Sequence, residues 1–256
     1  MNVKRLLVWT AEGQQRSMKF ECASRTHVGL RRKINEDSLL VDCDRGLWAV
    51  ADGMGGHEAG EIASTMVTDA LRCLPSVNGG DEFAARALET LRNVNHQLLD
   101  LARSYGQEEK STIGTTIVGL IIKEGLFNCF WMGDSRAYLI RGGDIRRLTH
   151  DHSLVQNLVD AGMLRPEEAE THENANLITR AVGASEKFEM DLVNGDAKAG
   201  DQFLLATDGL TRVVSDEQLA REITTRMPDE AADNLIEMVM ARGAPDNVSL
   251  IIVKLL

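Results

Sequence analysis

Four apolar segments of the chain have the length and composition of β-strands. They are residues 46–53, 127–135, 201–209 and 245–256. The first three are apolar up to an aspartate that stands beside a glycine, and the fourth begins with an aspartate and ends in a β-branched run. The aspartates at these strand ends are Asp52, Asp134, Asp208 and Asp246.

Apolar residues at helical spacing predict layers that cover the strands. Residues 58–74 and 81–103 both carry this spacing and are expected to form one layer. Near the C-terminus, Ser215 and Gln218 have the spacing of a capping box ahead of a helix, and residues 228–243 predict another helix. These later helices are expected to cover the other face.

The strand-end aspartates suggest a shared site. A single Asp-Gly pair is typical of a surface turn. In antiparallel sheets, however, the end of one strand and the start of its neighbour lie at the same rim, so these aspartates are expected to gather at one end of a pair of sheets. Two carboxylates about 4 Å apart repel by roughly 4 kcal/mol at an effective dielectric constant of about 20. Several together must therefore take up protons or bind cations.

The ligand types indicate which cations would bind. Oxygen ligands without His or Cys favour hard ions, Mg²⁺ or Mn²⁺, over zinc. Gly53 fits such a site, because without a Cβ its own carbonyl can approach an ion beside the Asp52 carboxylate.

Residues 29–41 add charged groups of both signs. Arg32 precedes the acidic pair Glu36 and Asp37 on a segment that leads into a strand. Because side chains alternate along a strand, Glu36 and Asp37 point in different directions, and one of them can face the ions directly or through water. Arg32 is then placed to cover a phosphate. Taken alone, the stretch is equally consistent with a solvated surface segment.

Composition and charge narrow the possible partners. The chain has 256 residues, 43% hydrophobic, which is ordinary for a globular protein with a substantial core. A net charge of −11 is the wrong sign for a protein that follows a phosphate backbone, so nucleic-acid binding is not expected. An acidic protein can still handle phosphate locally where bound cations invert the field.

Cysteine use and hydropathy bear on the location of the protein. No apolar run approaches the length of about 20 residues that a membrane helix needs, and no signal-peptide cleavage site is evident, so a cytoplasmic protein without a membrane segment is expected. The four cysteines are dispersed without a C-x-x-C pair, which argues against a zinc site and a dense disulfide scaffold.

Eight short motifs occur in an order that resembles a known family. They are RKINEDS (32–38), VADGMGGH (50–57), STIGTTIV (111–118), GDSRAYLI (133–140), LTHDHS (148–153), ITRAVG (178–183), LLATDGL (204–210) and DNVSLIIV (246–253). Together, from about residue 20 to the C-terminus, they resemble the compact bacterial branch of the metal-dependent Ser/Thr protein phosphatases, the PPM or PP2C family. The resemblance implies an α+β fold, a four-layer α-β-β-α sandwich of two antiparallel sheets flanked by helices.

The resemblance also assigns roles to residues. It implies two Mn²⁺ or Mg²⁺ ions bridged by Asp52, and possibly a third ion. The remaining implied roles are protein ligation by the Gly53 carbonyl, Asp208 and Asp246, metal-bound waters held by Glu36 and Asp37, phosphate binding by Arg32, and a third metal position at Asp134 with Asp208. It also makes residues 19–256 one domain, with a flap at about 163–176 and residues 1–18 as an extension that is possibly disordered.

The expected reaction is direct hydrolysis by water that the two ions activate, without a phosphoenzyme. The leaving oxygen still needs a proton. Many eukaryotic relatives have a His directly after Asp-Gly for this role, but here Met54 occupies that position, and His57 is the remaining candidate for the general acid.

Three functions remain open. The first is a phosphatase acting on phosphoserine and phosphothreonine in proteins, as a monomer that opposes a Hanks-type kinase. Type VI secretion regulation is one possible context. The second is a non-catalytic phosphoprotein-binding scaffold, which the intact Asp52, Asp208 and Asp246 argue against. The third is a metal hydrolase for another phosphoester such as a nucleotide, which the ligand set does not distinguish from the first.

Overall fold

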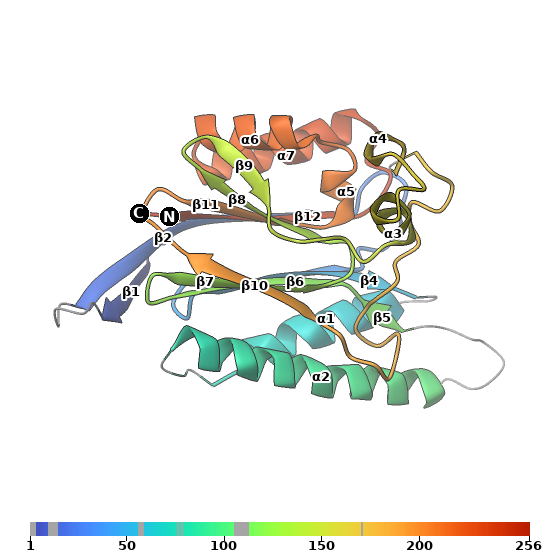
Figure 1. The fold of residues 1–256 in the computed structure, drawn as a ribbon, viewed down its shortest axis with the longest axis horizontal. Coiled ribbons are helices and arrows are strands. Elements are labelled where there is room, and N and C mark those ends of the chain that lie inside the picture. The colour runs from blue at the N-terminus through green and yellow to red at the C-terminus, as the bar shows by residue number, and fades with distance from the viewer. Residues whose placement is uncertain are drawn as a thin grey trace.

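The computed structural model describes residues 4–9, 15–55, 59–75, 77, 79–104, 113–169 and 171–256. Two antiparallel sheets lie face to face within these residues (Figure 1). The first sheet has the strand order β1 (Lys4–Trp9), β2 (Gln15–His27), β12 (Val248–Leu255), β11 (Gln202–Ala206), β8 (Arg136–Arg141) and β9 (Asp144–Arg147). The second has the order β10 (Asp191–Asp196), β7 (Leu126–Met132), β6 (Ile117–Lys123), β4 (Leu47–Met54) and β3 (Asp37–Asp42), with the short β5 (Gly114–Thr115) paired to β4.

Helices cover the outer faces of both sheets. Helices α1 (Ala59–Arg72) and α2 (Gly80–Ser104) lie on the second sheet, and α6 (Asp216–Thr225) and α7 (Pro228–Ala241) lie on the first, as Figure 1 shows. The short α5 (Asp208–Thr211), α3 (Leu154–Asp160) and α4 (Pro166–Ala169) lie toward one end of the sandwich. The α+β sandwich expected from the resemblance is therefore confirmed.

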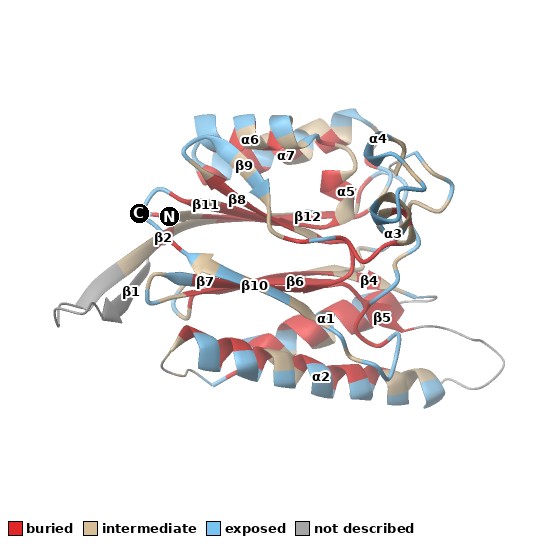
Figure 2. Ribbon diagram, in the orientation of Figure 1, coloured by how far each residue is buried: buried red, intermediate tan, exposed pale blue. Residues whose placement is uncertain are grey.

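The space between the sheets is filled by apolar side chains that alternate with residues facing the helices. Trp48 and Val50 of β4 pack into the inter-sheet core, whereas Ala49 and Ala51 face the helix α1 side. Ring pairs strengthen the contact, with centroids 4.9 Å apart for Phe20 and Trp48. Burying each large apolar side chain contributes roughly 1.5–3 kcal/mol. Figure 2 shows both sheets as mostly buried.

Helix boundaries follow local signals that the sequence carries. The capping box at Ser215 is present, with reciprocal bonds to Gln218. Ser153 caps α3 by accepting from the Gln156 backbone N–H. One boundary differs from the sequence expectation: β11 ends at Ala206, and Asp208 is the first residue of α5 rather than the last residue of a strand.

The N-terminal residues extend the first sheet at its edge. The sequence predicts residues 1–18 as an extension ahead of the domain. Within that stretch, β1 pairs antiparallel with β2, and β2 runs without interruption across the expected boundary at residue 19. None of the helices in the described part of the chain has the length and apolar composition to cross a membrane.

Candidate active site

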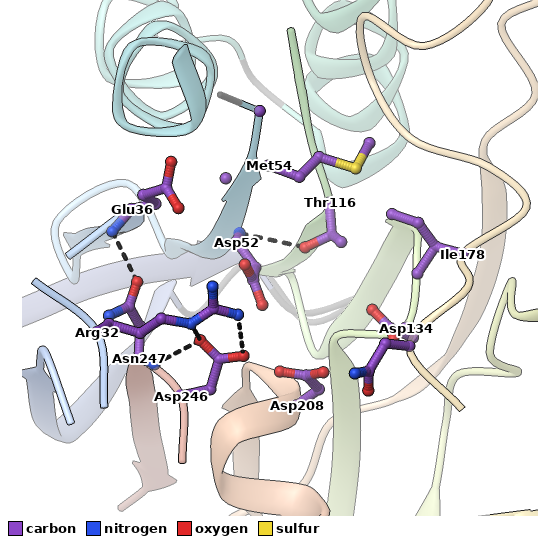
Figure 3. A pocket seen from close by; sticks show the side chains of 13 residues that line it. Arg32, Glu36, Asp52, Met54, Thr116, Asp134, Ile178, Asp208, Asp246 and Asn247 are labelled. Atoms are coloured by element: carbon purple, nitrogen blue, oxygen red, sulfur yellow. Dashed lines mark hydrogen bonds and ion pairs between the residues drawn. The ribbon is translucent and has the colours of Figure 1, made fainter. Parts of the chain in front are cut away.

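A pocket opens at the end of the sandwich where β4 ends and α5 begins. Its lining includes most of the predicted site residues: Arg32, Glu36, Asp52, Gly53, Asp134, Asp208 and Asp246. Figure 3 shows their side chains around one pocket, from both sheets and the loop before β3. The expected gathering of strand-end aspartates at one rim is therefore confirmed.

Asp52 stands at the centre of the second sheet's contribution. Its backbone is fixed by three hydrogen bonds: its N–H donates to the Thr116 hydroxyl at 3.1 Å, and its carbonyl accepts from the Thr116 N–H at 2.8 Å and the Thr115 hydroxyl at 2.9 Å. These bonds leave the carboxylate facing the pocket. Burial, and then repulsion by Asp37, Asp208 and other carboxylates, raises the pKa of Asp52 well above its usual value.

Asp208 and Asp134 share an arginine that the sequence did not single out. The Arg212 Nε lies 3.0 Å from Asp208 Oδ2, and its Nη2 lies 3.1 Å from Asp134 Oδ2. Burial and the neighbouring Asp208 charge raise the pKa of Asp134 to about 7, which Arg212 partly opposes. The spacing of Asp208 and Arg212, one helical turn, was the available signal, but nothing local indicated Asp134 as the second partner.

Arg212 also connects the pocket to the predicted flap at 163–176. Its Nη2 donates to the Ala175 carbonyl at 2.8 Å, and its Nη1 donates to the Asn176 side chain. Asn176 itself lines the pocket. The segment therefore lies beside the site, and its designation as a flap stays a prediction.

Arg32 and Asp246 form a two-point ion pair. Arg32 Nε donates to Asp246 Oδ1 and Nη2 donates to Oδ2, each at 2.7 Å (Figure 3). Asn247, next to Asp246, holds the loop that carries Arg32: its Nδ2 donates to the Val28 and Ile34 carbonyls at 2.9 and 3.0 Å. Its Oδ1 accepts from the Glu36 N–H at 2.8 Å. Asn247 is therefore a positioning residue that the sequence did not reveal.

Glu36 and Asp37 diverge as strand alternation predicts. Glu36 lines the pocket, whereas Asp37 lies opposite Asp52 on β3 and points inward, where its Oδ2 accepts from the Thr207 hydroxyl at 3.1 Å. The other oxygen of Asp37 has no hydrogen-bond partner among the described residues. Burial raises the pKa of Asp37 to about 7.

Gly53 is required by close backbone packing. A Cβ at this position would lie 2.0 Å from the Gly60 carbonyl oxygen and 2.6 Å from the Glu36 carbonyl oxygen. No side chain fits there, so the backbone of β4 can approach the loop before β3 and the start of α1. His57, the candidate for the general acid, lies outside the described residues.

The charges of the pocket fit a site for divalent cations. Several carboxylates with raised pKa values face one space, and all the predicted donors are oxygen atoms, which suits Mg²⁺ or Mn²⁺. In this conformation no three Asp, Glu, His or Cys side chains of the described residues are grouped so as to hold an ion. Arg32 and Arg212 neutralise part of the cluster instead.

Comparison with known families identifies the chain. Residues 30–241 match the family model described as protein phosphatase 2C. The chain belongs to the protein phosphatase 2C family. The match spans the pocket residues from both sheets except Asp246, which follows the matched range.

Named bacterial members of the family are similar over most of this chain. The serine/threonine protein phosphatase PstP of Mycobacterium tuberculosis is 37% identical over 230 residues, which is 90% of this chain and 44% of PstP, so the chain spans less than half of that relative. Protein phosphatase PhpP of Streptococcus pneumoniae is 35% identical over 241 residues, 90% of this chain and 95% of PhpP.

Solved structures agree with the family assignment. PppA, described as a key regulatory component of T6SS in Pseudomonas aeruginosa, has a TM-score of 0.84 at 35% identity, covering 93% of this chain and 98% of that one. The catalytic domain of PstP in complex with two manganese ions has a TM-score of 0.83 at 35% identity, with the same coverage.

Proposed function

We propose that this chain is a metal-dependent protein phosphatase that hydrolyses phosphoserine and phosphothreonine in proteins. The observation that carries the proposal is the convergence of Asp52, Asp208 and Asp246 with Arg32 in one pocket of a protein phosphatase 2C fold. A site with this charge is costly to build unless cations and an anionic substrate use it.

The proposed cation ligands are the Asp52, Asp208 and Asp246 carboxylates and the Gly53 carbonyl. Glu36 and Asp37 would hold water at the site, and Asp134 with Asp208 would form a third, weaker position. Two divalent ions, when bound, would lower the pKa of a water molecule and neutralise phosphoryl oxygens. The crystallised PstP catalytic domain holds two manganese ions, which supports the same choice of cation here.

Arg32 is proposed to bind the substrate phosphate. Its guanidinium already grips a carboxylate through two parallel hydrogen bonds of 2.7 Å, and the same fork matches two oxygens of a phosphate. The present partner, Asp246, is a proposed cation ligand. Exchange of Asp246 from Arg32 to a cation would therefore free the guanidinium for substrate.

Two hydrogen-bonded supports position these groups. Thr116 and Thr115 hold the backbone of Asp52, and Asn247 ties the loop bearing Arg32 and Glu36 to the start of β12. Such supports reduce the reorganisation needed when substrate binds. His57 as the proton donor to the leaving oxygen remains part of the proposal.

The proposal includes a physiological setting. We infer that the chain acts as a monomer in the cytoplasm, on phosphoproteins made by a Hanks-type Ser/Thr kinase. The named bacterial relatives are serine/threonine protein phosphatases, which supports phosphoproteins as the substrate class. The four cysteines are free thiols, as expected in a reducing compartment.

The decisive assay compares substrates over a metal titration. A phosphothreonine peptide, a phosphotyrosine peptide and a nucleotide are offered side by side at increasing Mn²⁺ and Mg²⁺. The proposal expects hydrolysis of the phosphothreonine peptide that requires the metal and exceeds the other two. A preference for the nucleotide would indicate a different phosphoester hydrolase, and tight peptide binding without turnover would indicate a scaffold.

A further inference from the structure

Two cysteines that are distant from the pocket meet between the sheets. Cys22 lies on β2 of the first sheet, and Cys43 directly follows β3 of the second. Their Sγ atoms lie 2.9 Å apart, in hydrogen-bond contact. Both side chains are partly buried at the margin of the inter-sheet core, so neither is sealed from solvent.

A buried indole lies beside the two sulfur atoms. Trp48 is fully buried, and its Nε1–H has no hydrogen-bond partner among the described residues. Donation from this N–H lowers the pKa of both cysteines. An indole N–H normally finds an acceptor when buried, and a thiolate at Cys43 or Cys22 would provide one.

The two thiols are not equivalent. The hydrogen bond from Cys22, followed by that from Trp48, lowers the pKa of Cys43 to about 7 against the opposing effect of burial. The contact with Cys43, together with burial, raises the pKa of Cys22. Cys43 is therefore the thiolate, and hence the nucleophile, near neutral pH.

We propose that Cys22 and Cys43 are a redox-active pair that forms a reversible disulfide between the two sheets by exchange with a small-molecule disulfide such as glutathione disulfide. A disulfide bond is about 2.05 Å long, so the sulfur atoms need to approach by roughly 0.9 Å, which small rotations of two side chains can supply. By contrast, Cys129 is fully buried, and Cys73 is exposed at the end of α1 without a contact to another described cysteine.

The exchange is balanced in two steps. The Cys43 thiolate attacks one sulfur of glutathione disulfide, forming a mixed disulfide and releasing one glutathione thiolate. Cys22 then loses its proton to solvent or to that thiolate and attacks the Cys43 sulfur, which releases the second glutathione. The two protein thiols lose two electrons and two protons, and glutathione disulfide gains them.

The disulfide would stabilise the sandwich without touching the pocket. It would close a loop of 21 residues and join strands of different sheets. By the loop-closure relation this raises the melting temperature by roughly 5 to 10 °C. At about 3.3 Å per residue, Cys43 lies roughly 20 Å along β3 from Asp37, so turnover is expected to be unchanged.

A peptide map of the wild-type chain tests the proposal directly. The protein is incubated with glutathione disulfide near pH 7.5, remaining thiols are alkylated, and the protein is digested without reductant for mass spectrometry. The expected product is one pair of peptides joined at Cys22 and Cys43 with the loss of two hydrogens, which dithiothreitol reverses. Alkylated Cys22 and Cys43, or a glutathione on each of them, would overturn the proposal.

Matched variants test the consequence for stability. The melting temperature of the oxidised protein should exceed that of the reduced protein in the wild type and in Cys73→Ser, but not in Cys43→Ser. An equal rise in Cys43→Ser would overturn the proposal. If Cys43→Ser does not fold, the peptide map still decides. Trp48→Phe keeps an aromatic ring but removes the N–H, so it should slow the exchange at pH 7 more than at pH 9.

Discussion

Strand β4 contains two regions that follow opposite rules. From Leu47 to Ala51 every side chain is fully buried and apolar, and these residues join the two sheets and α1 into one core. Asp52 and Gly53 follow at once, and there the strand places a carboxylate of raised pKa among others in the pocket. The core stabilises the fold, whereas the pocket rim carries unfavourable charge that only bound partners can offset.

This contrast separates the expected effects of substitution. Changes at the rim should remove activity while leaving stability intact or raising it, because they remove charge repulsion. Changes in the inter-sheet core should lower stability while leaving the activity of each folded molecule intact.

The largest effect is expected at the rim. Asp52→Asn or Asp208→Asn should lower Mn²⁺-dependent hydrolysis of p-nitrophenyl phosphate by roughly 1000-fold or more, since a charge that holds the reacting groups is lost. The melting temperature without divalent cations should not fall. Asp144→Asn, an exposed aspartate at the start of β9, is the matched control and should turn over normally. Wild-type turnover in either pocket variant would contradict the assignment.

The core should respond in the opposite way. Leu120 of β6 is fully buried between the sheets, so Leu120→Ala should lower the free energy of unfolding by about 2–5 kcal/mol through lost burial and a residual cavity. Urea unfolding measures this change, and the kcat of the folded fraction should be retained. Leu126→Ala, at an exposed position at the start of β7, should change stability by less than about 0.5 kcal/mol. A large loss of kcat in Leu120→Ala would show that core and rim are not separable.

Gly53 lies at the junction between the two regions. Gly53→Ala would force a methyl group against the Gly60 and Glu36 carbonyl oxygens, so the backbone beside Asp52 must shift. A displacement of about 1 Å can cost roughly 100-fold in rate, and stability should fall as well. Gly80→Ala is the control, because a Cβ there meets its nearest neighbour only at 3.5 Å. Thermal unfolding and steady-state kinetics measured on both variants would show whether the junction is this tight.

The smallest effect is expected at the exposed side of the rim. Arg32→Ala removes two charge-assisted hydrogen bonds to phosphate and should raise KM about tenfold. The adjacent Arg31 is also exposed, and Arg31→Ala is the control for general loss of positive charge at the pocket mouth. An unchanged KM and rate in Arg32→Ala, or equal changes in both variants, would remove Arg32 from the specific phosphate site.

The local patterns of the sequence determined the elements that carry the site. The apolar runs of β4, β7 and β12 and the amphipathic α1, α2 and α7 are all found close to their predicted bounds. The Ser215 capping box is correct for the same reason, because its hydrogen bonds join residues three apart. Strand alternation was also enough to predict that only one of Glu36 and Asp37 would face the pocket.

Features whose partners are distant in sequence, or whose strands are half exposed, were decided by the tertiary structure. Strand β10 alternates between intermediate and exposed residues, so its sequence lacks an apolar run. Arg212 resembles any surface arginine until folding brings it to Asp134, 78 residues away. Cys22 and Cys43 likewise become a pair only because β2 and β3 belong to facing sheets. Periodicity reports which side of an element is apolar, whereas the contacts between elements depend on how the two sheets are aligned, and that alignment is set by packing over the whole core.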